Sequence, residues 1–286
     1  MILYSIIVFV INKYVIEFRG GQNMWQENII RMQDYVYSGE SYSNVLLGSS
    51  LTMRVIIDIN DKRTFNLAAG GGDPLIGLEI LKRTKQKPKY VFIETNFVLT
   101  KEIHDQTYLN TLYMPGFYQA RKYMPIFRDQ YQPVTFLGQG LLFITKKAIN
   151  KNKPAHEDER EKNANVRKEL KLRTQKIKYE TGNFLDVKST IDQNALILQD
   201  YIKYFQKEGV VLCFFEMPRD CDYLNDKGSI YSRGKLQKII TANSLATISL
   251  PACEDYSTSD GLHLTDESSK KYTAYFLKEM AKLHDM

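Results

Sequence analysis

The sequence predicts an α/β protein in three layers, α/β/α, with a mostly parallel five-stranded sheet and an inserted helical segment. Five short apolar runs occur along the chain, and helical patterns lie between several of them. The runs are almost continuously apolar, which is typical of parallel strands that helices cover on both faces. The chain has 286 residues, 43% of them hydrophobic, which is enough for the core of one such domain.

The first half of the chain supplies two helices and three strands. Hydrophobic residues recur at helical intervals over residues 24–42. An apolar run over residues 44–48 ends in a glycine, and it predicts a buried strand followed by a tight turn. Two further strands are expected over residues 64–68 and 89–94, with an amphipathic helix over residues 75–81 between them.

The second half supplies the remaining strands and helices. A helix over residues 195–208 leads into a strand over residues 210–215. The fifth strand is expected over residues 247–250 and the last helix over residues 266–283. Ligands of parallel sheets bind at the carboxyl ends of the strands, so the residues that follow each strand are the candidates for a functional site.

A long segment, about residues 100–190, separates the third strand from the fourth. A structureless loop of this length is unusual in a compact domain, so we expect an inserted helical subdomain or lid. Its first half is rich in aromatic side chains, which pack within the insertion or stack on sugar rings. Its second half, residues 146–178, is crowded with Lys, Arg and Glu, which is typical of a solvated helix or flexible arm.

The N-terminal residues 1–23 form an apolar segment of their own. Residues 2–10 are almost all apolar, and a second apolar run follows Asn12 and Lys13. A membrane-spanning helix needs about 20 apolar residues, so the segment predicts a membrane anchor or the remnant of one. A buried N-terminal helix is the alternative. The globular domain is expected over residues 24–286.

Charge and cysteine content argue against several functions. The 39 basic and 33 acidic residues give a net charge of +6, which is not the concentrated charge of a nucleic-acid-binding protein. The histidines and cysteines lack the spacing of a metal site, so neither a metal nor a cofactor is expected. Cys221 and Cys253 fall in loops and could pair in an oxidising compartment, whereas Cys213 lies in an apolar strand.

Two short strings far apart in the chain supply the parts of a catalytic triad. Ser50 follows the first strand after Gly48, and Asp260 precedes His263 by three residues. A serine hydroxyl is a poor nucleophile until a base such as histidine removes its proton. A carboxylate behind the imidazole fixes its tautomer and stabilises the imidazolium. We therefore predict Ser50 as nucleophile, His263 as base and Asp260 as the orienting carboxylate. Asp260 or Asp266 could instead cap the last helix.

Three donors follow the ends of the first three strands. They are the backbone N–H groups of Ser50 and Gly71 and the side-chain amide of Asn96. Acyl transfer develops negative charge on the acyl oxygen, which needs such donors. We predict that these three groups form the oxyanion hole.

The order of these residues resembles the sequence blocks of the SGNH (GDSL-type) hydrolase superfamily. The first block of that superfamily usually reads Gly-Asp-Ser, and here it reads Gly48-Ser49-Ser50, so Ser50 takes the nucleophile position. The glycine of the second block matches Gly71, with Gly70 as the fallback.

The later blocks carry the resemblance to the C-terminus. The third block usually reads Gly-x-Asn-Asp; here it runs from Glu94 to Phe97 and keeps only Asn96. The fifth block, Asp-x-x-His, matches Asp260 and His263 without alteration. The resemblance covers about residues 43–100 and 205–283. It implies a flavodoxin-like sheet and a serine-dependent esterase or acyltransferase.

One branch of the superfamily is similar in two further respects. The apolar N-terminus and the strand end Phe215-Glu216-Met217-Pro218 resemble the membrane-anchored SGNH proteins associated with O-acetylation of cell-surface polysaccharide. That branch implies an extracytoplasmic domain, in the periplasm or at the cell surface. It moves or removes acetyl groups on glycans, often with a separate multi-spanning membrane acyltransferase.

Two alternatives stay open at this point. One is a catalytically inactive SGNH-fold module that binds a glycan or a partner protein, which the altered third block suggests. The other is an intracellular lipase-like esterase or thioesterase with a buried N-terminal helix. The sequence also leaves open whether water or a sugar hydroxyl accepts the acyl group.

Overall fold

The computed structural model describes residues 23–58, 60–84, 86–100, 106–131, 184–221 and 227–284. These residues form two compact units, one built around a β-sheet and one made of helices and turns. The apolar segment over residues 1–22 and the charged stretch over residues 146–178 lie outside the described residues.

The sheet of the first unit has five parallel strands in the order β2-β1-β3-β4-β5. The strands are β1 (Asn44–Leu47), β2 (Thr64–Asn66), β3 (Tyr90–Glu94), β4 (Val211–Phe215) and β5 (Ala246–Ile248). This order is flavodoxin-like, and the parallel sheet confirms the predicted α/β class. The connections run outward in opposite directions from β1 and β3, so the topological switch point lies between these two strands.

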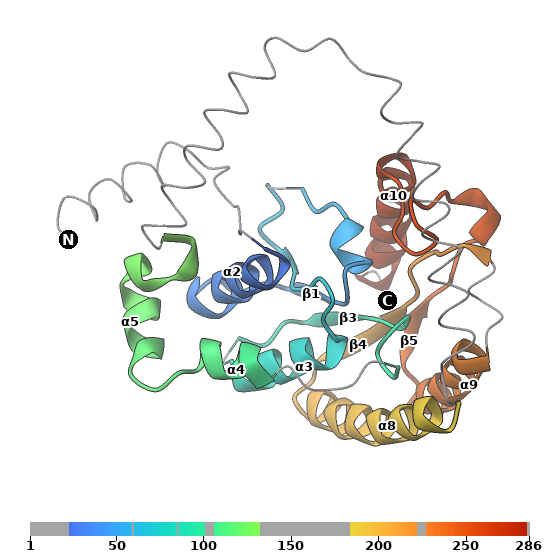
Figure 1. The fold of residues 1–286 in the computed structure, drawn as a ribbon, viewed down its shortest axis with the longest axis horizontal. Coiled ribbons are helices and arrows are strands. Elements are labelled where there is room, and N and C mark those ends of the chain that lie inside the picture. The colour runs from blue at the N-terminus through green and yellow to red at the C-terminus, as the bar shows by residue number, and fades with distance from the viewer. Residues whose placement is uncertain are drawn as a thin grey trace, which may run out of the picture. The chain divides into compact units, whose positions relative to one another are not determined.

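Helices cover both faces of the sheet, with α10 on one face and α3, α8 and α9 on the other (Figure 1). Their bounds are α3 (Pro74–Arg83), α8 (Phe184–Lys207), α9 (Lys227–Ala242) and α10 (Asp266–His284). Successive strand residues face opposite sides. Leu46 and Phe92 belong to the core under α10, where the rings of Phe92 and Phe276 meet edge to face with centroids 5.6 Å apart. On the other face, a Cβ added at Gly77 of α3 would lie 2.7 Å from Leu47. The three predicted layers are therefore present.

Side-chain caps set the starts of α3 and α10. Asp73 accepts a hydrogen bond of 2.9 Å from the N–H of Leu75, and a proline occupies the first position of α3. For α10, the hydroxyl of Thr265 accepts a bond of 3.3 Å from the N–H of Ser268. Asp266 is the first residue of that helix, so Thr265 acts as its cap in place of an aspartate.

Helix α9 was missed by the sequence analysis. It contains Gly228 and Gly234, and glycine inside a helix is unfavourable by about 1 kcal/mol relative to alanine. Its buried face includes Leu236, Ile239 and Ile240, and the helix packs against α8. Burial of this face stabilises a helix that local propensity does not favour.

The buried free thiol of the protein is Cys213 on β4. Its side chain is 0% exposed and belongs to the core under α10. Burial raises the pKa of the Cys213 thiol to about 12. The thiol is therefore inert at neutral pH.

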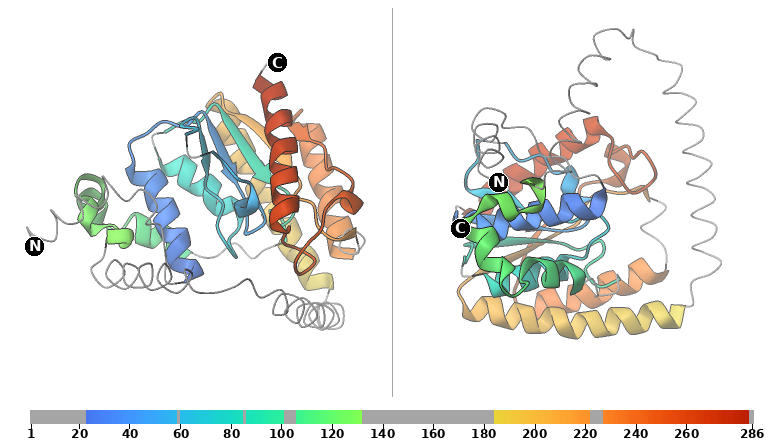
Figure 2. Two further views of the ribbon diagram at one scale, coloured as in Figure 1. Left: turned by 90° about the horizontal axis from the view of Figure 1, so that it is seen from above. Right: turned by 60° about the vertical axis from the view of Figure 1, so that its left-hand side comes forward.

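The second unit joins α2 to helices of the predicted insertion (Figure 2). Its elements are α2 (Met24–Tyr37), α4 (Gln106–Leu112), α5 (Phe117–Tyr123) and the 3₁₀ turns η2 (Pro125–Phe127) and η3 (Asp129–Tyr131). The amide of Asn28 donates to the hydroxyl of Tyr108 at 2.8 Å, and the N–H of Asp129 donates to Gln33 at 2.9 Å. The helix after the N-terminal segment therefore packs with the insertion.

Aromatic side chains of this unit pack partly against one another. Trp25 stacks on Tyr108 with centroids 6.1 Å apart, and Tyr113 stacks on Tyr118 at 5.8 Å. Tyr123 is exposed. Packing within the unit thus accounts for several of the aromatic residues noted in the sequence.

Across the described ranges, no helix combines the length and the apolar composition needed to cross a membrane. The predicted anchor at residues 1–23 lies almost entirely outside those ranges.

Candidate active site

The structure brings the three predicted triad residues into one hydrogen-bonded chain. The hydroxyl of Ser50 lies 2.8 Å from Nε2 of His263, and Nδ1 of His263 lies 2.7 Å from Oδ2 of Asp260. An ionised carboxylate only accepts, so the proton between Asp260 and the ring belongs to Nδ1. Nε2 is then the atom that can take the proton of Ser50.

Ser50 stands at the carboxyl end of β1, in a turn that only glycine can begin. A Cβ added at Gly48 would lie 2.1 Å from Oγ1 of Thr52 and 2.6 Å from Oε2 of Glu94. The turn directs Ser49 into the core, where it is fully buried, and leaves Ser50 partly exposed. The second serine of the string is therefore the accessible one.

Glu94, the last residue of β3, holds this turn from inside. Its Oε2 accepts hydrogen bonds from the N–H of Ser49 at 2.8 Å and from the hydroxyl of Thr52 at 2.6 Å. The N–H of Thr52 donates to the same oxygen at 3.3 Å, and the hydroxyl of Ser49 donates to Oε1 at 2.9 Å. In the sequence, Glu94 stands out only as the end of a strand and as a position that differs from the third block.

A second brace comes from the end of β2. The amide of Asn66 donates to the carbonyl of Thr52 at 2.9 Å and to that of Val55 at 3.2 Å. The N–H of Ala69 donates to the carbonyl of Gly48 at 3.0 Å. The loops after β1 and β2 are therefore bonded side by side.

The loop that carries the base is closed on itself. Oδ1 of Asp260 accepts from the N–H of Leu262 at 3.0 Å and from that of His263 at 2.8 Å. Gly261 adopts a φ of 90°, which favours glycine. An isolated antiparallel bridge pairs Thr258 with Leu264 across the loop. Asp260 therefore bonds both the backbone and the ring of the residue that it orients.

A disulfide between Cys221 and Cys253 lies next to this loop, with Cα atoms 5.5 Å apart. Asp220 precedes Cys221, and its N–H donates to the carbonyl of Gly261 at 3.0 Å. The carboxylate of Asp220 accepts from the hydroxyl of Thr258 at 2.6 Å. The disulfide therefore ties the segment after β4 to the approach to the base, and it settles the pairing that the sequence left open.

The carboxyl groups of Glu94 and Asp260 are shifted in opposite directions. Burial raises the pKa of the Glu94 carboxyl above its usual value and outweighs the donors around it. Burial acts in the same direction on Asp260, but hydrogen bonds from His263 and Leu262 outweigh it and hold the pKa of Asp260 below its usual value. Asp260 is thus ionised at neutral pH, as stabilising an imidazolium requires.

The predicted oxyanion donors differ in what they bond. Four of the five backbone N–H groups from Ser49 to Met53 have partners. The N–H of Ser50 is the fifth, and it has none among the described residues. Gly71 is exposed with a φ of 67° in the loop bonded to Gly48. These features leave the N–H of Ser50 available to a substrate oxygen.

Asn96, the third predicted donor, bonds the end of β4. Its amide nitrogen donates to the carbonyl of Met217 at 3.0 Å, and its oxygen accepts from the N–H of Met217 at 2.8 Å. The described residues show no hydrogen bond from Asn96 to Ser50 or His263. An amide nitrogen carries two hydrogens, and one is used here.

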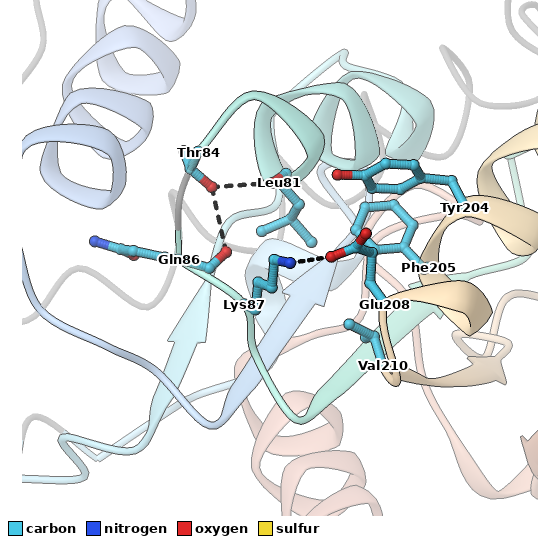
Figure 3. Close-up of a pocket in the computed structure, with 8 residues that line it drawn as sticks. All are labelled: Leu81, Thr84, Gln86, Lys87, Tyr204, Phe205, Glu208 and Val210. Atoms are coloured by element: carbon cyan, nitrogen blue, oxygen red, sulfur yellow. Dashed lines mark hydrogen bonds and ion pairs between the residues drawn. The ribbon is translucent and has the colours of Figure 1, made fainter.

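Two other features of the first unit do not belong to this site. A small pocket with room for about one water molecule lies at the opposite, amino edge of the sheet. Lys87 and Glu208 form an ion pair in it (Figure 3). Within the described residues, Cys221, Cys253 and Glu254 form the one group with metal-ligating atoms close enough for an ion. Because the two sulfurs form a disulfide, they are not the thiolates that a metal would need.

Comparison with models of known protein families gave no match. Comparison with curated proteins gave none either.

Proposed function

We propose that this protein is a serine-dependent acyl-ester enzyme of SGNH type that acts on acetylated cell-surface polysaccharide. The observation that carries the proposal is the chain from Ser50 through His263 to Asp260, with bonds of 2.8 and 2.7 Å. Its position also supports the proposal. It lies at the carboxyl edge of the sheet, where β1 and β3 form the switch point at which such folds bind ligands.

The proposed reaction has two halves. The Oγ of Ser50 attacks the ester carbonyl carbon while Nε2 of His263 takes the hydroxyl proton, and Asp260 stabilises the imidazolium. The N–H of Ser50, with Gly71 and Asn96, binds the oxyanion. The intermediate collapses, the leaving alcohol receives the proton, and the acetyl group stays on Ser50. The oxygen of an acceptor, water or a sugar hydroxyl, then attacks the acetyl carbon while Nε2 of His263 takes its proton. The bond between the acetyl carbon and Oγ of Ser50 breaks, His263 returns the proton to Oγ, and the acetyl group leaves on the acceptor.

The acceptor decides between two activities of the same site. Water makes the protein an O-acetylesterase, and a sugar hydroxyl makes it an O-acetyltransferase. In the proposed pathway, acetylated carbohydrate or another acyl donor supplies the acetyl group, and a separate multi-spanning membrane acyltransferase is the expected partner of the transferase.

We also propose an extracytoplasmic location, in the periplasm or at the cell surface, with the N-terminal segment as membrane anchor. The Cys221–Cys253 disulfide supports it, because disulfides form and persist in oxidising compartments.

An aryl acetate tests the nucleophile. Ser50→Ala should lower acetate release on the order of 10³-fold or more, because the acetyl-enzyme cannot form. Ser257→Ala, an exposed serine ahead of the base, is the matched control and should keep wild-type activity. Wild-type release no faster than that of Ser50→Ala would overturn the enzyme proposal for this substrate class and favour a binding module.

A second experiment separates the two acceptors. The protein is incubated with an acetylated oligosaccharide and an unacetylated one, and both are followed by mass spectrometry. Gain of acetyl on the unacetylated sugar identifies a transferase, and free acetate alone identifies an esterase.

A further inference from the structure

We infer that Glu94 is a positioning residue for the nucleophile, holding the Gly48–Arg54 turn so that Ser50 faces His263 and keeps its own N–H for the substrate. This inference rests on the proposed function, because it assigns a task within the same reaction.

The bonds of Glu94 bracket the nucleophile. They reach the N–H and hydroxyl of Ser49, one residue before Ser50, and the N–H and hydroxyl of Thr52, two residues after it. Among the described residues, the side chain of Glu94 accepts hydrogen bonds from Ser49 and Thr52 alone. A buried acid that only stabilised the core could accept hydrogen bonds from any part of the chain. The donors to Glu94 all come from Ser49 and Thr52, which flank Ser50.

The bonds also account for the backbone of the turn. The N–H groups of Ser49 and Thr52 go to Glu94, and the N–H of Leu51 goes to the hydroxyl of Ser49 at 3.1 Å. That hydroxyl is held in turn by Glu94. Three N–H groups around Ser50 therefore depend on one carboxyl group, directly or through one serine. The N–H of Ser50 is left over as a donor.

Strand β3 fixes the position of the Glu94 carboxyl group. Glu94 is paired with Phe215 in the β3–β4 register, and the next residue, Thr95, donates its N–H to the carbonyl of Phe215 at 2.8 Å. The side chain is 0% exposed, so water cannot replace it as an acceptor. The turn is thereby built on the sheet rather than on a mobile loop, as precise catalytic geometry requires.

An acceptor of this kind has no close substitute. In the structure both oxygens of Glu94 accept from Ser49 or Thr52, whereas a glutamine amide turns an NH₂ group toward donors. Glu94→Gln keeps the volume of the side chain but sets a donor against the hydroxyl or N–H groups of Ser49 and Thr52. It therefore tests the hydrogen bonds separately from the packing.

The experiment compares Glu94→Gln with Val91→Ala. Val91 is fully buried on the same strand, so its truncation weakens the core without touching the turn. Three quantities are measured on each protein: the melting temperature, kcat and KM for an aryl acetate, and the rate at which a fluorophosphonate labels Ser50. Tandem mass spectrometry distinguishes a label on Ser50 from one on Ser49.

Glu94→Gln should lower kcat and the labelling rate about 100-fold with little change in KM, since a misplacement of about 1 Å costs that much. Val91→Ala should lower the melting temperature while keeping kcat and the labelling rate of wild type. A folded Glu94→Gln protein that labels as fast as wild type would overturn the inference. Equal losses of kcat in the two variants would overturn it as well.

Thr52→Val decides the matter if Glu94→Gln fails to fold. It removes one hydroxyl donor to Glu94 and keeps the shape of the side chain. We expect a loss of about tenfold in labelling rate, and unchanged labelling would overturn the inference. Failure of the proposed function looks different, because wild-type protein would then take no label at Ser50 and release no acetate.

Discussion

The two halves of the candidate site are built in opposite ways. The nucleophile turn, Gly48–Arg54, is held from inside by Glu94, which is 0% exposed. The base loop, Thr258–Leu264, is held near the surface by Asp260, whose side chain is 44% exposed. One half is positioned by buried hydrogen bonds and close packing. The other is positioned by a short closed loop, a charged carboxylate and a neighbouring disulfide.

This difference separates stability from activity. Loss of a buried acceptor leaves its donors without a hydrogen-bond partner, because water cannot reach them. Changes around Glu94 should therefore affect both folding and catalysis. Solvent can replace the partners of a group as exposed as Asp260, so changes there should affect catalysis alone. Substitutions in each half of the site can test that division.

Asp260→Asn should give the largest loss of activity. The amide can turn an NH₂ group toward Nδ1 of His263, which then favours the wrong tautomer, and a loss of kcat on the order of 10⁴-fold is expected. The melting temperature should stay near that of wild type. Aryl acetate kinetics and thermal unfolding check the two parts. A melting temperature that falls as far as that of Glu94→Gln would break the contrast between the halves.

Among changes near the base loop, removal of the disulfide should give the largest loss of stability. The cross-link joins cysteines 32 residues apart, and the Cys221→Ser, Cys253→Ser double variant should lose about 3–4 kcal/mol of unfolding free energy. Denaturant unfolding measures it, and wild type under reducing conditions should match the variant. Unchanged stability in both cases would show that the hydrogen bonds of Asp220 hold the loop alone.

Gly48→Ala should disturb the buried half. The new methyl group would meet Thr52 and Glu94 at 2.1–2.6 Å, so we expect a loss of about 1–3 kcal/mol together with reduced activity. Gly234→Ala is the control, because a Cβ there meets nothing within 4 Å. In helix α9 it should raise stability by about 1 kcal/mol. A Gly48→Ala protein with wild-type kcat would show that the contacts of Glu94 with the turn contribute to stability and not to catalysis.

The smallest effect should be a pair of opposite pH dependences of the unfolding free energy. The folded-state pKa of Asp260 is lowered from 3.8, so its contribution is present above 3.8 and is lost as the pH falls through the folded-state pKa. The folded-state pKa of Glu94 is raised from 4.5. Its contribution to the unfolding free energy is therefore present below pH 4.5 and is lost as the pH rises through the folded-state pKa. Relative to Asp260→Asn, the unfolding free energy of wild type should fall slightly as the pH falls, and relative to Glu94→Gln it should fall as the pH rises. If both comparisons showed the unfolding free energy changing with pH in the same direction, the opposite pKa shifts of Asp260 and Glu94 would be contradicted.

The fold could be predicted because its signals are local. The apolar runs of β1, β3 and β4 mark these strands in the sequence. The five strands were located closely, although β2 contains one apolar residue, Phe65. Helix α9 escaped because Gly228 and Gly234 weaken the helical pattern, and its stability comes from packing on α8.

The triad could be predicted in part for the same reason. Asp260 and His263 lie in one short string, and Ser50 follows a strand. The contact of Glu94 with Ser49 joins β3 to the turn after β1, and no local pattern signals it. Only the carboxylate at the end of an otherwise apolar strand hinted that it had a buried partner.

Two of the three positions at which the chain differs from the first and third SGNH blocks are neighbours in space. The pattern has a carboxylate at the position of Ser49 and a glycine at that of Glu94. In this protein those two residues are hydrogen-bonded to each other. Read along the chain, they are two unrelated differences. In the structure, they form one hydrogen bond between the turn after β1 and the end of β3.

The state of the cysteines has a practical use. All three of them are accounted for, since Cys213 is buried and Cys221 and Cys253 are joined. A thiol added at exposed Tyr123 in the helical unit, or at exposed Leu196 on α8, would be the first to react with a maleimide dye. A dye pair at these two positions would report the distance between the units by energy transfer without removal of any native cysteine. Toward such reagents, a protein with three cysteines behaves as if it had none.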